Sequence, residues 1–151
     1  MRLFRHVLRD AKRFSLVEFY QLAKHQNQQT KYIAGFPVNR ILGLYGGSIG
    51  ERNLLKIAKH NLTHNFDSFG ILEFLSEYQS WFCDRHGFQN TAVRDVKTKT
   101  KVRPKIAELS DFEISEIRRC NALDFQLYDF ARQLFVARYM ANRNQKTEDS
   151  A

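Results

Sequence analysis

The chain has 151 residues, of which 43% are hydrophobic and 26% are charged, and its formal net charge at pH 7 is +8. This length fits a single domain with a substantial core, and no stretch is long and apolar enough to predict a transmembrane helix. The positive charge predicts attraction to anions such as nucleic acid, anionic lipid or phosphorylated small molecules. A basic soluble protein without a polyanionic partner is the alternative.

The two cysteines and the first residues indicate a reducing compartment. Cys83 and Cys120 each lie in an apolar helical pattern, where free buried thiols are commoner than a disulfide. The opening stretch "MRLFRHVLRDAKRF" is basic but lacks a continuous apolar region, so it does not resemble a secretory signal. We therefore expect a cytoplasmic protein.

The N-terminal part predicts two helices and a loop. Apolar residues recur at helical spacing over residues 2–12, which predicts an amphipathic helix. Ser15 and Glu18 have the spacing of a capping box, so a second helix is expected from 16 to about 27. The glycine-rich stretch 35–50 is expected to be a loop. The spacing of its glycines fits neither phosphate-binding glycine pattern.

The middle of the chain predicts a helix, a strand and another helix. Residues 51–64 place Leu54, Leu62 and other apolar residues on one face, as in an amphipathic helix. The stretch "FDSFGIL", residues 66–72, is short, apolar and bounded by polar residues, which is typical of a strand. A helix is expected to follow and to end at Gly87, since glycine is favoured just after a helix.

The C-terminal part predicts a long connection and two helices. Residues 88–109 have no helical period, and long ordered loops are often functional. Ser110 and Glu113 have the spacing of a second capping box. They are followed by apolar patterns that predict helices over 111–120 and 123–143.

These elements predict one domain over residues 1–144 and a disordered tail over 145–151. A single strand cannot form a sheet by itself. Either the fold is wholly helical, or the chain is part of an α/β fold whose other strands are missing or unrecognised.

The basic run "DVKTKTKVRPK", residues 95–105, carries Lys or Arg at every second position. In an extended segment these cations would share one side and could follow a nucleic-acid backbone, although the run has no aromatic residues for base stacking. Alternatively, its lysines and threonines could contact the phosphate groups of one small ligand. A solvated loop is the third interpretation.

Two further features have weak chemical interpretations. His60 and His64 are spaced i, i+4, as zinc ligands can be, but no third ligand is evident, so no metal site is predicted. Glu73 directly follows the predicted strand and could act as a catalytic carboxylate. It could also stabilise the N-terminus of the next helix by its charge, which is the preferred interpretation.

Several segments in order resemble the C-terminal half of a sulfotransferase, over about residues 5–140. They are "SLVEFYQL", "NQQTKYIAG", "ERNLLKIAKHNLTHNFDSFGILEFLSEYQSWFCDRHGF" and "NALDFQLYDFARQLF". The group they resemble contains heparan-sulfate 2-O-type and related Golgi-type and bacterial enzymes. Each segment is weak alone, and their shared order and spacing carry the resemblance.

This resemblance implies an α/β fold like that of P-loop NTPases. It also implies transfer of a sulfuryl group from 3′-phosphoadenosine 5′-phosphosulfate (PAPS) to an acceptor hydroxyl, expected to be on a carbohydrate. The phosphosulfate-binding loop of the family has no counterpart here, and the usual catalytic base falls in the missing part, so the catalytic residues are unknown. We expect an incomplete, C-terminal fragment whose own activity is in doubt and whose fold a partner chain could complete.

The resemblance also assigns a role to the basic run. In the family, the loop before the last two helices closes over the nucleotide. By position, Lys97, Thr98, Lys99, Thr100 and Lys101 are the candidate contacts to PAPS or adenosine 3′,5′-bisphosphate. The alternative function is a small basic helical protein that binds a partner subunit or nucleic acid, and nucleic acid is not the expected partner.

Overall fold

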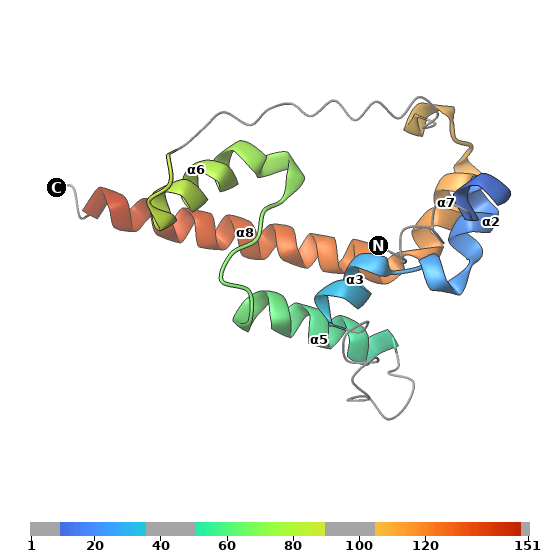
Figure 1. Ribbon diagram of the computed structural model, residues 1–151, viewed down its shortest axis with the longest axis horizontal. Helices are drawn as coiled ribbons and strands as arrows, with labels where there is room; N and C mark the ends of the chain where they lie inside the picture. The colour runs from blue at the N-terminus through green and yellow to red at the C-terminus, as the bar shows by residue number, and fades with distance from the viewer. Residues whose placement is uncertain (1–9, 36–50, 90–104, 149–151) are drawn as a thin grey trace.

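The computed structural model describes residues 10–35, 51–89 and 105–148, with side chains omitted at 51, 52, 140 and 142–148. The described part consists of helices arranged around one long helix, α8 (Figure 1). In chain order they are α2 (Leu16–Gln21), η1 (Ala23–His25), α3 (Gln28–Ile33), α5 (Glu51–His64), η2 (Leu72–Phe74), α6 (Leu75–His86), η3 (Ile106–Glu108), α7 (Asp111–Cys120) and α8 (Ala122–Glu148). None of the described helices is both long and apolar enough to cross a membrane.

Two groups of helices pack along α8. At one end of α8, α2 packs on α7, and further along α3 and α5 pack against each other and against α8 (Figure 1). The buried core lies where α3, α5 and α8 meet. It consists of Ala34, Leu54, Ala58, Leu62, Ile71, Leu123, Leu127, Ala131 and Phe135. Burial of this apolar surface is the main force that holds these helices together.

The predicted capping signals are confirmed. The Ser15 side chain accepts a hydrogen bond from the backbone N–H of Glu18, and the Glu18 carboxylate accepts one from the backbone N–H of Ser15. Ser110 and Glu113 make the same pair of bonds at the start of α7. The helix α6 ends at Gly87, whose φ of 69° lies in the left-handed region that glycine favours. Cys83 and Cys120 are both free and buried, as predicted.

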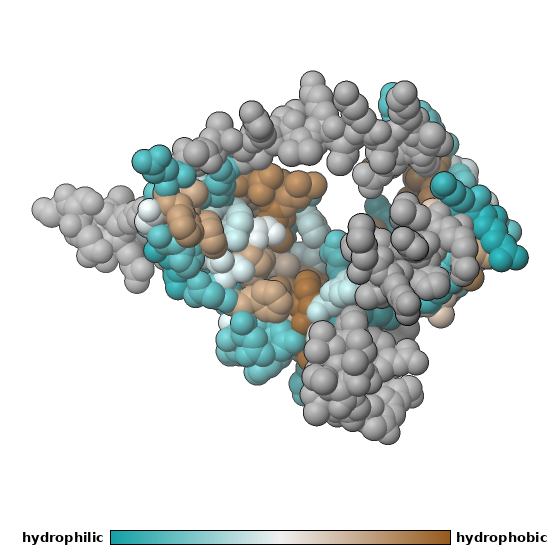
Figure 2. Space-filling model, in the orientation of Figure 1, coloured by the Kyte–Doolittle hydropathy of each residue, from teal (hydrophilic) through white to brown (hydrophobic). Residues whose placement is uncertain are grey.

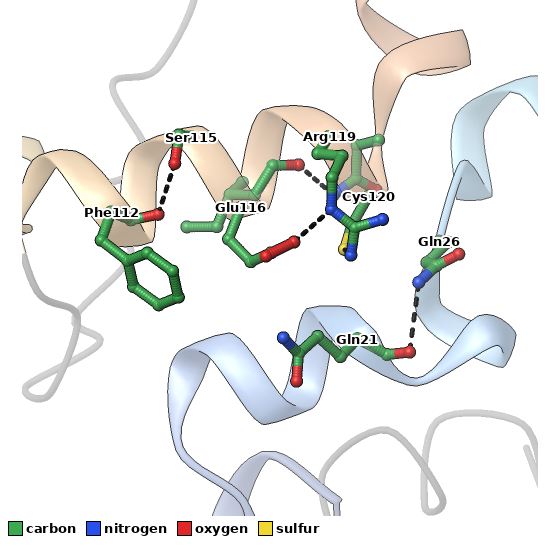
Figure 3. Close-up of polar contacts among 9 residues, drawn as sticks. Gln21, Gln26, Phe112, Ser115, Glu116, Arg119 and Cys120 are labelled. Atoms are coloured by element: carbon green, nitrogen blue, oxygen red, sulfur yellow. Dashed lines mark hydrogen bonds and ion pairs between the residues drawn. The ribbon is translucent and has the colours of Figure 1, made fainter.

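Polar contacts along α7 stay within that helix (Figure 3). The Ser115 hydroxyl donates to the carbonyl of Phe112, and the Arg119 side chain pairs with Glu116 one turn earlier. Arg119 also lies 3.7 Å from the sulfur of Cys120.

The predicted helix over 16–27 is wrong in its second half. It stops at Leu22, whose backbone is extended, and after η1 the chain begins the new helix α3 at Gln28. The break is held by Asn27, a buried residue with a left-handed φ of 50°. A non-glycine residue adopts this conformation only where its surroundings compensate. At Asn27 the compensating bonds come from Asn121, which precedes α8, and from the first turn of α8.

The predicted strand over 66–72 is also wrong. Residues 66–71 form no strand, and the segment ends in η2. Ile71 is extended and buried, as the apolar pattern implied. A strand additionally requires a neighbouring strand to accept and donate its backbone hydrogen bonds. The described ranges contain no strand that could do this, so residues 66–71 are irregular. An α/β fold remains an implication of the resemblance.

The last helix is longer than predicted. α8 begins at Ala122 and runs to Glu148 instead of ending near residue 143. Residues 145–148, expected to belong to a disordered tail, are therefore helical. By contrast, α5 and α7 have the predicted bounds. The predicted loop over 35–50 and the predicted helix over 2–12 lie largely outside the described residues.

Candidate functional site

Asn27 connects the start of α3 to the start of α8. Its side-chain oxygen accepts hydrogen bonds from the backbone N–H groups of Leu123 at 3.0 Å and Asp124 at 3.4 Å. Its own backbone N–H donates to the side-chain oxygen of Asn121 at 3.1 Å. The first N–H groups of a helix have no partner within the helix. Asn27 thus supplies the cap of α8 from a segment that is distant in the sequence.

Asp124 of α8 in turn caps the N-terminus of α3. One carboxylate oxygen accepts bonds from the backbone N–H and the hydroxyl of Thr30, each at 2.7 Å, and the other accepts from the backbone N–H of Gln29 at 3.2 Å. A negative charge at a helix N-terminus is also favoured by the helix dipole. We call this set of four residues, Asn27, Thr30, Asn121 and Asp124, the reciprocal cap. It fixes two helix starts against each other.

A groove of about 580 Å³ opens beside the reciprocal cap. It is bounded by α2, η1, α3, α7 and α8. Half of its lining residues have aromatic rings, and the others are three amides, one carboxylate and one isoleucine: Phe19, Tyr20, His25, Gln28, Gln29, Ile117, Asn121, Asp124, Phe125 and Tyr128. We call it the aromatic groove. Its volume lies in the range of ordinary ligand sites, which are largely apolar with a few placed polar groups.

His25 is held rigidly in the wall of the aromatic groove. The residue is 8% exposed, and its Nε2 lies 2.9 Å from a carboxylate oxygen of Asp10. Its ring stacks on Phe19, with centroids 4.1 Å apart. The ammonium of Lys24 lies 2.5 Å from the same oxygen of Asp10. Hydrogen bonds from Lys24 and then His25 lower the pKa of Asp10 below its ordinary value, so this carboxylate is charged at neutral pH.

A second polar cluster lies one turn further along α8. The Tyr128 hydroxyl donates to the carboxylate of Glu73, which lowers the pKa of Glu73 and raises the pKa of Tyr128. The positive charge of Arg132 lowers the pKa of Glu73 further. Glu73 was expected to act in catalysis or to stabilise the next helix. It lies in the first turn of η2, directly before α6, where a negative charge favours the helix start. Its bond to Tyr128 also ties η2 to α8, and Tyr128 lines the aromatic groove as well.

The predicted nucleotide contacts cannot be placed. Lys97, Thr98, Lys99, Thr100 and Lys101 all lie outside the described residues. The rings of His60 and His64 lie 4.6 Å apart on α5, and both residues are exposed. Over residues 10–35, 51–89 and 105–148 there is no group of three or more His, Cys, Asp or Glu that could hold a metal ion.

The residues of the reciprocal cap lie in two of the segments that resemble sulfotransferases, but the sequence did not predict that they cap helices. Asn27 and Thr30 belong to "NQQTKYIAG", and Asn121 and Asp124 belong to "NALDFQLYDFARQLF". A signal was present, because Asn and Asp are favoured at the starts of helices. Each cap, however, acts on the other helix, about 95 residues away in the chain, and local spacing cannot reveal such a pair.

Curated proteins with similar sequences are heparan-sulfate 6-O-sulfotransferases. Heparan-sulfate 6-O-sulfotransferase 2 of Danio rerio is 30% identical over 145 residues, which cover 90% of this chain and 29% of that protein. Heparan-sulfate 6-O-sulfotransferase 3-B of Danio rerio is 31% identical over 125 residues, which cover 82% of this chain and 29% of that protein. Heparan-sulfate 6-O-sulfotransferase 1 of Homo sapiens is 33% identical over 129 residues, which again cover 82% of this chain and 29% of that protein.

These similarities confirm the resemblance to sulfotransferases. The relatives are named for the 6-O position, whereas the sequence segments were compared with the 2-O-type group. The chain spans less than a third of the length of the relatives cited here. No family model matches the chain, and no solved structure matches it.

Proposed function

We propose that this chain, a homologue of part of the heparan-sulfate 6-O-sulfotransferases, contributes to a sulfotransferase that uses PAPS and acts on a carbohydrate hydroxyl. The observation that carries this proposal is the similarity to those relatives over 82 to 90% of the chain. PAPS would supply the activated sulfuryl group, and the protein would bind and orient the two substrates.

The packing of the similar segments supports a shared structural unit. The segments "NQQTKYIAG" and "NALDFQLYDFARQLF" meet in the reciprocal cap. The apolar residues of the second segment, Leu127, Ala131 and Phe135, are buried in the core. The residues that carry the resemblance therefore stabilise one arrangement of α3, α5 and α8. This arrangement would present the aromatic groove and the connection before α7 to the substrates.

The contacts to the phosphate groups of the cofactor are assigned to the basic run, residues 95–105. The described lining of the aromatic groove offers rings and amides, which suit a nucleoside better than a phosphate group. The carboxylate of Asp124 is already engaged by Thr30 and Gln29. We assign the phosphate groups to Lys97, Thr98, Lys99, Thr100 and Lys101, because ammonium and hydroxyl groups are suitable donors to phosphate oxygens.

A further polypeptide is expected to complete the fold. Hydrophobic surface lies over η2 and the start of α6 (Figure 2), where Leu72 is 80% exposed. Phe112 of α7 and Phe125 of α8 are 65% and 45% exposed. Exposed apolar patches commonly mark surfaces that contact another protein. The part of the relatives that this chain does not span is the proposed partner.

Titration with adenosine 3′,5′-bisphosphate tests the proposal. We expect saturable binding by calorimetry and a rise in the melting temperature, because a ligand that binds only the folded state stabilises it. Replacement of Lys97 and Lys99 by Gln should weaken binding. Replacement of Lys12 and Lys56, which removes the same charge elsewhere, should not.

Two outcomes would contradict nucleotide binding. One is the absence of binding or stabilisation at millimolar nucleotide. The other is an equal loss in both double variants, which would indicate a response to net charge alone. Salt-sensitive binding to DNA without any effect of the nucleotide would favour the alternative function, a basic nucleic-acid-binding protein.

A further inference from the structure

The described residues that line the aromatic groove leave apolar surface uncovered. Phe125 of α8 lines the groove and is 45% exposed, and half of the lining residues carry aromatic rings. Contact between such surface and water is unfavourable. The polar groups of the wall are already engaged, since Asp124 holds α3 and Tyr128 holds Glu73 of η2. The groove therefore favours an occupant that is mainly apolar.

The chain before Asp10 is joined to the described part at the wall of this groove. Asp10 is 3% exposed, and its carboxylate lies 2.9 Å from Nε2 of His25, which lines the groove. The same carboxylate pairs with Lys24. Residues 10–13 are helical, as the sequence predicts. The chain is thus anchored at Asp10, which places the attachment point of residues 1–9 beside the groove.

The sequence of residues 1–9 has the pattern that an apolar occupant needs. In a helix, Leu3 and Val7 share a face with Asp10, since successive members of this set are four and three positions apart. The bond between Asp10 and His25 directs this face of a continuing helix toward the groove. The arginines of the segment have the same spacing and fall on the opposite face: Arg2, Arg5 and Arg9. Their charges would stay in water.

We propose that residues 2–9 form a helical strap that lies in the aromatic groove, with Leu3 and Val7 against its rings and the arginines toward solvent. An amphipathic helix in an apolar groove is a recurring mode of peptide recognition. The strap is tethered at Asp10, so it competes with any ligand of the groove at a high effective concentration. A ligand enters only after the strap leaves. This inference rests on the groove and the segment, and it does not depend on the proposed sulfuryl transfer.

Paramagnetic broadening in NMR spectra tests the position of the strap. A nitroxide is attached at Arg5→Cys in the full chain, and the two native cysteines are buried, so the label reacts at the introduced thiol. We expect strong loss of amide signal at Tyr20, Gln29 and Phe125, which line the groove. The amide of Arg138 should keep its signal, because Arg138 lies thirteen positions after Phe125, about 20 Å further along α8.

Val7→Ser and Leu8→Ser are a matched pair of variants in the labelled chain. Both residues are apolar and adjacent, but Leu8 falls on the side of the helix away from Asp10. Val7→Ser should release the strap. The signal loss at the groove amides should then fall several-fold, and the melting temperature should drop by about 2–4 °C. Leu8→Ser should leave both quantities unchanged. Circular dichroism establishes that each variant keeps the native helix content.

Three results would overturn the proposal. They are full signal at the groove amides of the labelled chain, equal effects of Val7→Ser and Leu8→Ser, and a signal loss at Arg138 as strong as that at Phe125. A mixture of labelled chain and isotope-enriched chain without label tests whether the contact is intramolecular. Signal loss at the groove amides in that mixture would assign the groove to a second copy instead. Since no nucleotide is present, failure here is distinct from failure of the adenosine 3′,5′-bisphosphate titration.

Discussion

Two residues on one face of α8 attach two different segments of the chain to it. Asp124 holds the first turn of α3, and Tyr128, one turn later, holds Glu73 of η2. Both residues also line the aromatic groove. The shape of this groove therefore depends on polar contacts made by α8. Loss of either contact should lower the stability of the folded chain, whether or not a ligand is bound.

The contact between Tyr128 and Glu73 predicts a dependence of stability on pH. Its hydrogen bond lowers the pKa of Glu73 below the ordinary value of 4.5. A group whose pKa is lowered by folding stabilises the folded state above its ordinary pKa. This stabilisation is lost as the pH falls through the lowered value. Tyr128→Phe should therefore lower the melting temperature at neutral pH, and the difference from the native chain should shrink below the pKa of Glu73.

Tyr32→Phe is the control for this measurement. Tyr32 is 57% exposed on α3, so loss of its hydroxyl should leave the melting temperature nearly unchanged at both pH values. A difference between Tyr128→Phe and the native chain that is the same at neutral and at acidic pH would show that the charge of Glu73 is not involved.

At the scale of elements, the reciprocal cap explains why α3 exists as a separate helix. With six residues, α3 is too short to be stable alone in water. It forms because Asp124 accepts bonds from its first N–H groups and because Ala34 at its end is buried in the core. The start of α8 depends on Asn27 in return, so the two helices should lose stability together.

Replacement of Asn27 tests this coupling. Asn27→Ala removes the cap of α8 and places alanine at a left-handed φ, so we expect a loss of about 1–2 kcal/mol in the free energy of unfolding. Asn27→Gly should cost less, because glycine adopts this conformation without strain. Denaturant unfolding, followed by circular dichroism, measures both values.

Asn53→Ala is the corresponding control. Asn53 is exposed on α5, where alanine is the better helix former, so its replacement should be neutral or slightly stabilising. If Asn27→Ala costs no more than Asn53→Ala, the bonds from Asn27 to α8 contribute nothing measurable and the proposed coupling fails.

The elements that the sequence predicts well are those determined by local pattern. The helix α5 has the predicted bounds because its apolar residues repeat at helical spacing, and α7 begins where Ser110 and Glu113 form a capping box. The same holds for the end of α6 at Gly87. In each case the determining residues lie within a few positions of one another.

The errors occur where distant residues decide the structure. The break after Leu22 and the start of α3 depend on Asn121 and Asp124, which no local window contains. The segment 66–72 has the composition of a strand, but a strand needs a partner strand. The predicted cation contacts, Lys97 to Lys101, lie outside the described residues and stay a prediction. The aromatic groove was not predicted, because it arises only from the packing of helices that are distant in the sequence.

At the scale of the whole molecule, the helices form an open arrangement. One end of α8 carries α2 and α7, and the segments around α5 and α6 lie along the rest (Figure 1). Large apolar side chains such as Leu72, Phe112 and Phe125 remain exposed. These exposed side chains are the observation on which the proposed contact with a further polypeptide rests, and the chain spans less than a third of the length of the relatives cited above.

The central claim is that this unit can serve in sulfuryl transfer. It is tested by replacing the 145 residues of Danio rerio heparan-sulfate 6-O-sulfotransferase 2 that match this chain with the chain itself. Transfer of labelled sulfate from PAPS to heparan sulfate is then measured, with the same protein lacking those residues as the control. We predict transfer clearly above this control. A chimera that folds cooperatively and binds adenosine 3′,5′-bisphosphate, yet transfers no more sulfate than the control, would contradict the claim.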